Sequence, residues 1–171
     1  MIASDLNTNE YSPYFKGFIE KVSHVELLNG LKQNEEVTIS FFKSIPESKH
    51  DYAYAAGKWT VKQLLLHLID VERIFVYRAL RIARNDNTPL SGFDENHYAD
   101  NSQAEMYSID QLLKSYQVLR ASTINLFESF SNDMLLRIGE VSGSQISVRA
   151  IGFITIGHEK HHIQIIKERY L

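Results

Sequence analysis

Apolar side chains recur at steps of three or four residues in four long stretches of the chain. These stretches cover residues 25–44, 61–84, 109–130 and 148–169. Because this spacing gathers the apolar side chains on one face of a helix, each stretch predicts an amphipathic helix. None of the three prolines falls inside a stretch, so no helix is expected to be interrupted. Each helix should be about 30 Å long.

Three of the predicted helices are preceded by residues that cap a helix N-terminus. Thr60 with Gln63, and Ser108 with Gln111, match the capping box, in which two side chains satisfy backbone N–H groups reciprocally. Ser147 is the expected N-cap of the last helix. These signals fix where the helices begin more firmly than the apolar spacing does.

Four amphipathic helices bury their apolar faces most simply against one another, so the predicted fold is an all-α four-helix bundle. The 85–107 segment is long enough to run the length of a helix, which favours a crossover that leaves the second and third helices parallel. Residues 131–146 predict a loop or a small hairpin. We expect residues 1–171 to form a single domain, with residues 1–15 as an extended N-terminal arm.

Composition and charge narrow the classes of protein that remain. Of 171 residues, 44% are hydrophobic and 23% charged, which is ordinary for a globular domain. The net charge of −3 argues against a nucleic-acid partner, and the absence of cysteine excludes disulfides, thiolate ligands and cysteine nucleophiles. No apolar run is long enough to predict a membrane helix, and the first residues do not resemble a secretory signal. We therefore expect a cytoplasmic protein without a membrane partner.

Histidine is the residue type that points to chemistry. His158 and His162 are four residues apart in the apolar stripe of the 148–169 helix, so both should point into the bundle. His67 lies in the apolar stripe of the 61–84 helix, at a matching depth if the two helices are antiparallel. Three neutral imidazoles around one divalent ion would leave an open coordination position, as in catalytic metal sites. His161 should face elsewhere.

Other interpretations of these histidines stay open. A buried histidine is often a hydrogen-bonded core residue, although three buried imidazoles without a shared partner leave several nitrogens to satisfy. The string from His158 to His162 also matches the zinc-peptidase pattern H-E-x-x-H, in which the glutamate is the general base. Such peptidases usually take a third ligand downstream, and no histidine follows His162. Glu159 remains a candidate acid–base residue, with a solvated helix face as its alternative.

Two further residues of the 61–84 helix are candidates for the site. Asp70 lies one turn after His67 and could contact a ligand imidazole, or it could pair with Arg73 on the helix surface. Arg78 shares the His67 stripe and could meet an anionic group of a substrate or cofactor.

The chain resembles the DinB-like superfamily, which includes YfiT-type metal hydrolases and bacillithiol- and mycothiol-dependent transferases. The resemblance rests on residues 57–60, 67–73, 78–84, 89–96 and 157–162, which read GKWT, HLIDVER, RALRIAR, PLSGFDEN and GHEKHH. It covers most of the chain, and the arrangement of three histidines is its most specific part.

The resemblance implies a four-helix bundle with a crossover, and a divalent metal, zinc or nickel, held by His67, His158 and His162. It implies a small-molecule substrate and a homodimer. The expected function is therefore a metal-dependent enzyme, either a low-molecular-weight-thiol S-transferase using a thiol such as bacillithiol or a small-molecule hydrolase. The alternative is a non-catalytic metal-binding or stress-related bundle.

Overall fold

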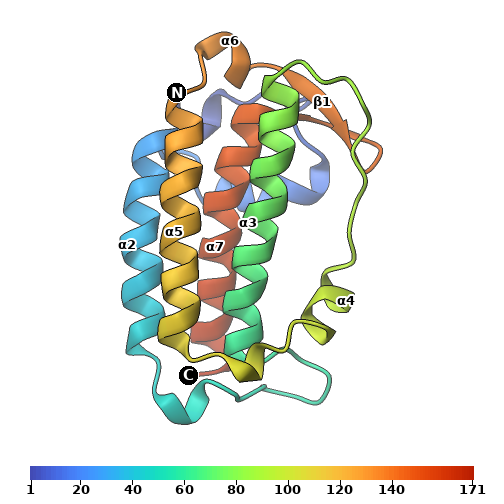
Figure 1. Cartoon of the computed structure of the whole chain (residues 1–171). Coiled ribbons are helices and arrows are strands. Elements are labelled where there is room, and N and C mark those ends of the chain that lie inside the picture. The colour runs from blue at the N-terminus through green and yellow to red at the C-terminus, as the bar shows by residue number, and fades with distance from the viewer.

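Four long helices lie side by side in the computed structural model, which describes residues 1–171 (Figure 1). They are α2 (Leu27–Ser44), α3 (Val61–Ala83), α5 (Ile109–Glu128) and α7 (Val148–Arg169). Helix α3 packs against α5 and α7, and α2 packs against the same two helices. The predicted four-helix bundle is therefore confirmed, with helix ends within two residues of those expected from the apolar spacing.

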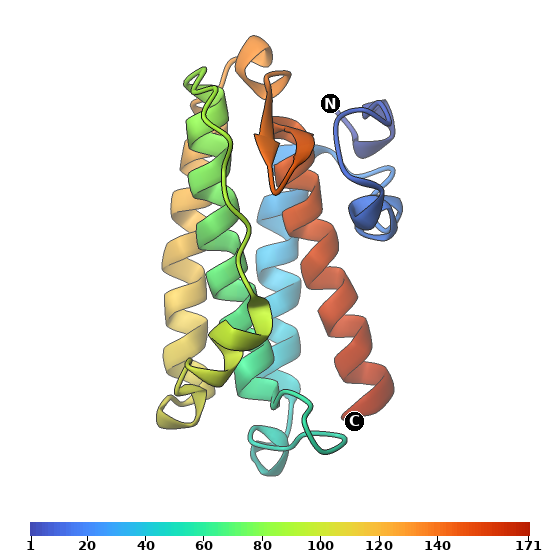
Figure 2. The same cartoon turned by 90° about the vertical axis from the view of Figure 1, so that its right-hand side faces the viewer.

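The connection between α3 and α5 crosses the length of the bundle (Figure 2). It carries the short helices α4 (Glu95–Asp100) and η4 (Ala104–Met106). Because the chain returns to the end at which α3 began, α3 and α5 run parallel, whereas α7 runs antiparallel to α3 (Figure 1). The predicted crossover is confirmed, and so is the antiparallel arrangement on which the matching depth of the histidines depends.

The predicted N-terminal caps are present. The backbone N–H of Gln63 donates to Oγ1 of Thr60 at 3.1 Å, and the N–H of Thr60 donates to the Gln63 side chain at 2.9 Å. The same reciprocal pair joins Ser108 and Gln111. Oγ of Ser147 accepts from the N–H of Ala150 at 3.1 Å at the start of α7. Local sequence therefore sets where three of the four long helices begin.

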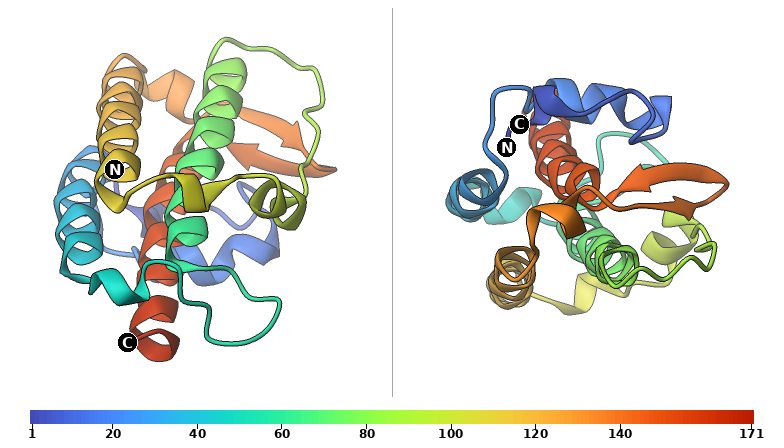
Figure 3. Two further views of the ribbon diagram at one scale, coloured as in Figure 1. Left: turned by 60° about the horizontal axis from the view of Figure 1, so that its bottom comes forward. Right: turned by 90° about the horizontal axis from the view of Figure 1, so that it is seen from above.

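A hairpin precedes α7. Strands β1 (Ile138–Val141) and β2 (Ser144–Ser147) pair antiparallel and are joined by Ser142 and Gly143, both at positive φ. Two such residues form the turn whose twist suits a two-residue hairpin. The crossover strengthens the hairpin, since Leu90 and Ser142 share a backbone hydrogen bond of 2.9 Å. Seen from above, the hairpin projects from the bundle beside the crossover (Figure 3).

The shorter helices cover the ends and one side of the bundle. They are η1 (Ala3–Asp5), η2 (Pro13–Phe15), α1 (Lys16–Glu20), η3 (Glu47–Lys49) and α6 (Asn132–Leu135). Helix α1 packs directly against α7. None of the helices has the length and apolar character needed to cross a membrane.

The N-terminal residues 1–15 are not an extended arm, contrary to expectation. They contain η1 and η2, and Ala3 belongs to the apolar core. The buried carboxylate of Glu10 accepts from Nε of Arg149 at 2.7 Å and from Oγ of Ser147 at 2.8 Å. Burial alone would raise the pKa of Glu10, but hydrogen bonds from Arg149, Asn7 and Ser147 lower it to about 2. This buried ion pair holds the N-terminal segment against the first turn of α7. No periodic pattern in the sequence predicts the pair.

The interior consists of two apolar clusters. One surrounds Leu31, Phe127 and Ile154, and the other surrounds Phe42, Tyr116 and Ile166. On α2, α5 and α7, buried polar residues lie between the segments that belong to the two clusters, among them Asn34, Arg120, His158 and Glu159. On α3, His67 lies among residues of the second cluster and Glu72 among residues of the first.

Candidate metal centre

Three imidazole rings from α3 and α7 converge on one point between the two helices. Nε2 of His158 lies 3.1 Å from Nε2 of His67 and 3.0 Å from Nε2 of His162. One ring nitrogen from each of the three residues lies within 4.8 Å of the other two. The structure thus brings together the three histidines that the sequence selects as metal ligands.

The donor set fits a divalent cation better than it fits a hydrogen-bonded cluster. Nε2 of His158 faces two other Nε2 atoms, yet a neutral ring nitrogen either donates one proton or accepts one. One cation between the three nitrogens would satisfy three lone pairs at once, in a set of neutral ligands that suits zinc or nickel. Nδ1 of His162 is buried without a hydrogen-bond partner, so packing against its neighbours holds this ring. Three protein ligands leave room for a further one.

Burial keeps the three imidazoles neutral, which is the form that binds metal. Desolvation lowers the pKa of His67 from 6.5 to about 4 and that of His162 to about 3. The pKa of His158 falls well below its usual range because of desolvation and then because of the neighbouring imidazoles. All three rings are therefore ready to coordinate a cation at neutral pH without first losing a proton.

The metal-free protein should lose stability as the pH falls below about 6.5, the pKa of an ordinary histidine. Unfolded imidazoles take up protons near pH 6.5, whereas folded His67 and His162 resist protonation down to about 4 and 3. The unfolded chain therefore binds more protons in this window, and the free energy of unfolding falls by about 1.4 kcal/mol for each pH unit and each such histidine. Urea unfolding in the presence of a chelator, between about pH 7 and about pH 5, measures the slope.

A His67→Gln variant should show a smaller slope than the parent protein over the same range. The matched control is His97→Gln, because His97 is exposed on α4 and should leave the slope unchanged. A parent protein whose stability stays flat between these pH values would show that the three imidazoles are not buried as neutral groups.

The three histidines line a cavity of about 480 Å³. Its walls come from α3, α7, the N-terminal segment, the crossover and the hairpin. They are largely apolar and aromatic, with Trp59, Phe75 and Phe93 among them, and polar groups enter from Arg78, Glu95 and the hairpin. A cavity of this size accommodates a small organic molecule. The open side of the histidine cluster therefore faces a space in which a substrate could bind.

Gly157 allows the N-terminal segment to close one wall of this cavity. A Cβ atom at Gly157 would lie 2.2 Å from the backbone oxygen of Phe18, so only glycine permits the contact between α1 and α7. The approach places the Phe18 ring 5.5 Å from the His158 ring and 5.2 Å from the His161 ring, between centroids. Glycine at this position thus shapes the surroundings of the metal centre.

We expect Gly157→Ala to destabilise the protein by about 1–3 kcal/mol, because the added methyl group meets backbone that has to shift. Urea unfolding measures the change. Gly17→Ala, on the facing helix, is the matched control, since its Cβ would meet nothing within 4 Å. Equal stability of the two variants would contradict the close approach of α1 to α7.

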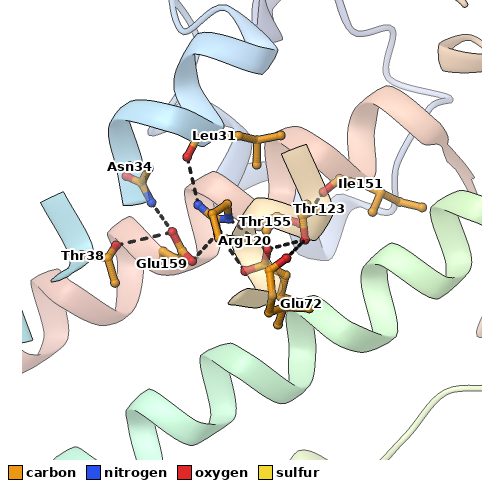
Figure 4. A network of polar contacts seen from close by, with 10 residues as sticks. Leu31, Asn34, Thr38, Glu72, Arg120, Thr123, Ile151, Thr155 and Glu159 are labelled. Carbon is orange, nitrogen blue, oxygen red and sulfur yellow. Dashed lines mark hydrogen bonds and ion pairs between the residues drawn. The ribbon is translucent and has the colours of Figure 1, made fainter. Parts of the chain in front are cut away.

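Glu159 does not belong to this cavity, which corrects its candidacy as an acid–base residue. Its side chain is 2% exposed and points between α2 and α5, where it accepts from Arg120 at 2.5 Å and from Asn34 (Figure 4). Arg120 also donates to both carboxylate oxygens of Glu72, at 2.9 Å and 2.8 Å. Burial raises the pKa of Glu159 to about 7 against the lowering effect of Arg120. The match to the zinc-peptidase pattern is therefore a coincidence of sequence, because its glutamate faces away from the histidines.

Asp70 is likewise absent from the cavity. Its carboxylate accepts from Nη1 of Arg73 at 3.0 Å, which is the surface pair that the sequence offered as the alternative. The physical reason is that residues three apart on a helix are neighbours, and Arg73 offers a charge that a neutral imidazole does not. Arg78, in contrast, lines the cavity as its place in the stripe predicts.

Sequence reasoning missed several residues of the site. His161 was expected to face elsewhere, yet it lines the cavity with its ring centroid 5.3 Å from that of His162. Phe18 and the hairpin residues Ser142 and Gln145 also line it. They lie far from the histidines along the chain and have no periodic pattern, so the only available signal was the glycine before His158.

Comparison with known proteins places the chain in a family. Residues 31–166 match the DinB superfamily, so this chain belongs to the DinB superfamily. A protein of Oceanobacillus iheyensis, named as a candidate metal-dependent hydrolase, is 24% identical over 154 residues, which cover 86% of this chain and 87% of that protein. A Bacillus licheniformis protein with the same description is 27% identical over 143 residues, covering 82% of this chain and 81% of its own.

Two solved structures share the fold. YfiT from Bacillus subtilis, described as a candidate metal-dependent hydrolase with an unusual four-helix bundle topology, superposes with a TM-score of 0.76 at 20% identity, covering 93% of this chain and 91% of that one. A DinB-like protein, YjoA, from the same organism superposes with a TM-score of 0.58 at 15% identity, covering 83% of this chain and 87% of that one. The crossover bundle is therefore a fold that this chain shares with these two proteins.

Proposed function

We propose that this protein is a divalent-metal-dependent enzyme that hydrolyses a small molecule. The observation that carries the proposal is the convergence of His67, His158 and His162 on one point at the wall of a 480 Å³ cavity. A metal centre with a purely structural role would be closed by packed side chains. The three histidines instead line a cavity of substrate size, so a cation held by them would keep a position accessible to a substrate. The descriptions of the two curated relatives as candidate metal-dependent hydrolases support the same reaction class.

In this proposal, different residues of the cavity hold the cation, bind the substrate and accept a proton. The three neutral imidazoles would hold the cation, which supplies a Lewis acid that polarises a substrate and lowers the pKa of a neighbouring water or thiol. The aromatic walls around Trp59 and Phe75 exclude bulk water and bind the apolar part of a substrate. His161 is half-buried at the cavity, and desolvation lowers its pKa below 6.5, so its neutral ring can accept a proton there.

Transfer of a low-molecular-weight thiol, such as bacillithiol, to an electrophile is the second candidate reaction. The chain has no cysteine, so a thiol nucleophile would have to enter as a small molecule. The cavity has the volume to hold such a thiol, and a metal centre with an open position favours the thiolate form. This reaction uses the same three histidines, and only the nucleophile differs.

Turnover measurements on one metal-loaded preparation distinguish the candidates. One panel contains activated esters and amides with water as the nucleophile, and the other contains bacillithiol or glutathione with alkylating electrophiles. Activity should disappear on chelation and return with zinc or nickel, and it should persist in the surface variant Arg73→Gln. A metal-loaded protein that turns over neither panel would contradict the proposal and favour a non-catalytic metal-binding bundle.

A further inference from the structure

Arg78 is a buried cation without a carboxylate partner. It is 7% exposed, and its guanidinium forms one hydrogen bond within the protein, from Nη2 to the backbone oxygen of Ser91 at 2.8 Å. The other two buried arginines differ, since Arg120 and Arg149 each form an ion pair with a buried glutamate. A guanidinium has five N–H donors, and burial of an unpaired charge is unfavourable. Arg78 therefore keeps donors free for a group that the chain itself does not supply.

These free donors belong to the cavity of the metal centre. Arg78 lines it, and its guanidinium carbon lies 5.8 Å from the Phe75 ring centre and 5.7 Å from the Phe93 ring centre. The Phe75 ring centre is in turn 6.5 Å from that of His158. A single aromatic ring thus separates the guanidinium from the histidine cluster, and a small molecule can touch both. Glu95 is the one acidic residue of the lining, and it forms no ion pair with Arg78.

We propose that Arg78 binds the anionic group, a carboxylate or a phosphate, of the molecule whose reacting end lies at the three histidines. The proposal deepens the function proposed above and rests on it for the identity of the molecule as a substrate. A planar guanidinium suits both anions because it can form two parallel hydrogen bonds to either. The aromatic rings beside it would pack against an apolar stem. The substrate class is thus a small organic anion with an apolar middle.

Binding to the metal-free protein tests the anion site separately from catalysis. Trp59 is the only tryptophan, and its ring centroid is 4.7 Å from that of His67, so its fluorescence reports occupancy of the cavity. The probes are 3-phenylpropionate and phenyl phosphate, with neutral 3-phenylpropanamide as the matched compound. Each anion should bind at least about tenfold more tightly than the amide, because hydrogen bonds to charged groups are the stronger ones. The anion that is preferred identifies the head group.

The Arg78→Gln variant should lose the preference for anions and bind the amide as before, whereas Arg78→Lys should keep part of it. Arg73→Gln, a surface change on the same helix, should keep all of it. An anion-to-amide ratio that is equal in the parent, the glutamine variant and the lysine variant would overturn the proposal. Arg78 would then serve only to hold the crossover through its hydrogen bond to Ser91. The ratio is measured without metal, so its outcome is independent of the turnover assays. The parent protein can prefer the anions even if neither turnover panel shows activity, and it can lack this preference while turnover is observed.

Discussion

A His67→Ala variant should purify as a folded bundle that no longer retains a divalent metal. His67 is the only one of the three clustered histidines on α3, so its loss leaves two imidazoles on one helix and opens the proposed site. Loss of a group that merely orients a ligand weakens metal binding by about 10–100-fold, so loss of a ligand should weaken it by more than about 100-fold. Competition against a metal-binding dye measures the affinity, and the turnover proposed above should be lost with it.

The melting temperature gives an independent control for this variant. A metal that binds only the folded state stabilises it, so chelation should lower the melting temperature of the parent protein and leave that of His67→Ala unchanged. His97→Ala, at an exposed histidine on α4, should behave as the parent does. If His67→Ala kept the parent's affinity, the cation would have to bind elsewhere.

The second large effect is expected at Arg120, whose loss should destabilise the protein by about 3–5 kcal/mol. Its guanidinium is fully buried between two carboxylates, Glu72 and Glu159, and it also donates to the backbone oxygen of Leu31 at 3.1 Å (Figure 4). An Arg120→Met variant would leave two buried acids without a counter-ion. Urea unfolding at matched metal content measures the change.

Neutralising the acids separates the charge effect from the change of side-chain volume. An Arg120→Met variant that also carries Glu72→Gln and Glu159→Gln should regain a large part of the lost stability, because no uncompensated charge then remains buried. Lys32→Met is a control in which a surface ion pair with Glu128 is lost, and it should cost less than about 1 kcal/mol. A triple variant as unstable as Arg120→Met would contradict this explanation.

The sequence predicts the bundle and the histidine cluster because both follow from helical geometry. Apolar spacing gives the helices, capping residues give their starts, and a rise of 1.5 Å per residue is enough to match His67 with His158 and His162 across antiparallel helices. These inferences need only local rules and one long-range assumption, namely the crossover.

What the sequence does not predict depends on contacts between distant segments. The pairing of Glu10 with Arg149 and that of Arg120 with Glu159 join residues far apart in the chain, and nothing local distinguishes these charges from solvated ones. The sequence therefore predicts an extended N-terminal segment, and it offers Glu159 only as an acid–base candidate or as part of a solvated helix face, neither of which is its buried place beside Arg120. The cavity wall formed by Phe18 depends on the packing of α1, a five-residue helix too short for a periodic signal.

Anomalous diffraction from crystals of the zinc-loaded protein tests the central claim most directly. Data at the zinc absorption edge should show one strong peak per chain, about 2.0–2.1 Å from Nε2 of His67, His158 and His162, with its remaining side facing the cavity. The account would be contradicted by a map with no peak between these rings, or by a zinc ion bound elsewhere while the three imidazoles hydrogen-bond to one another.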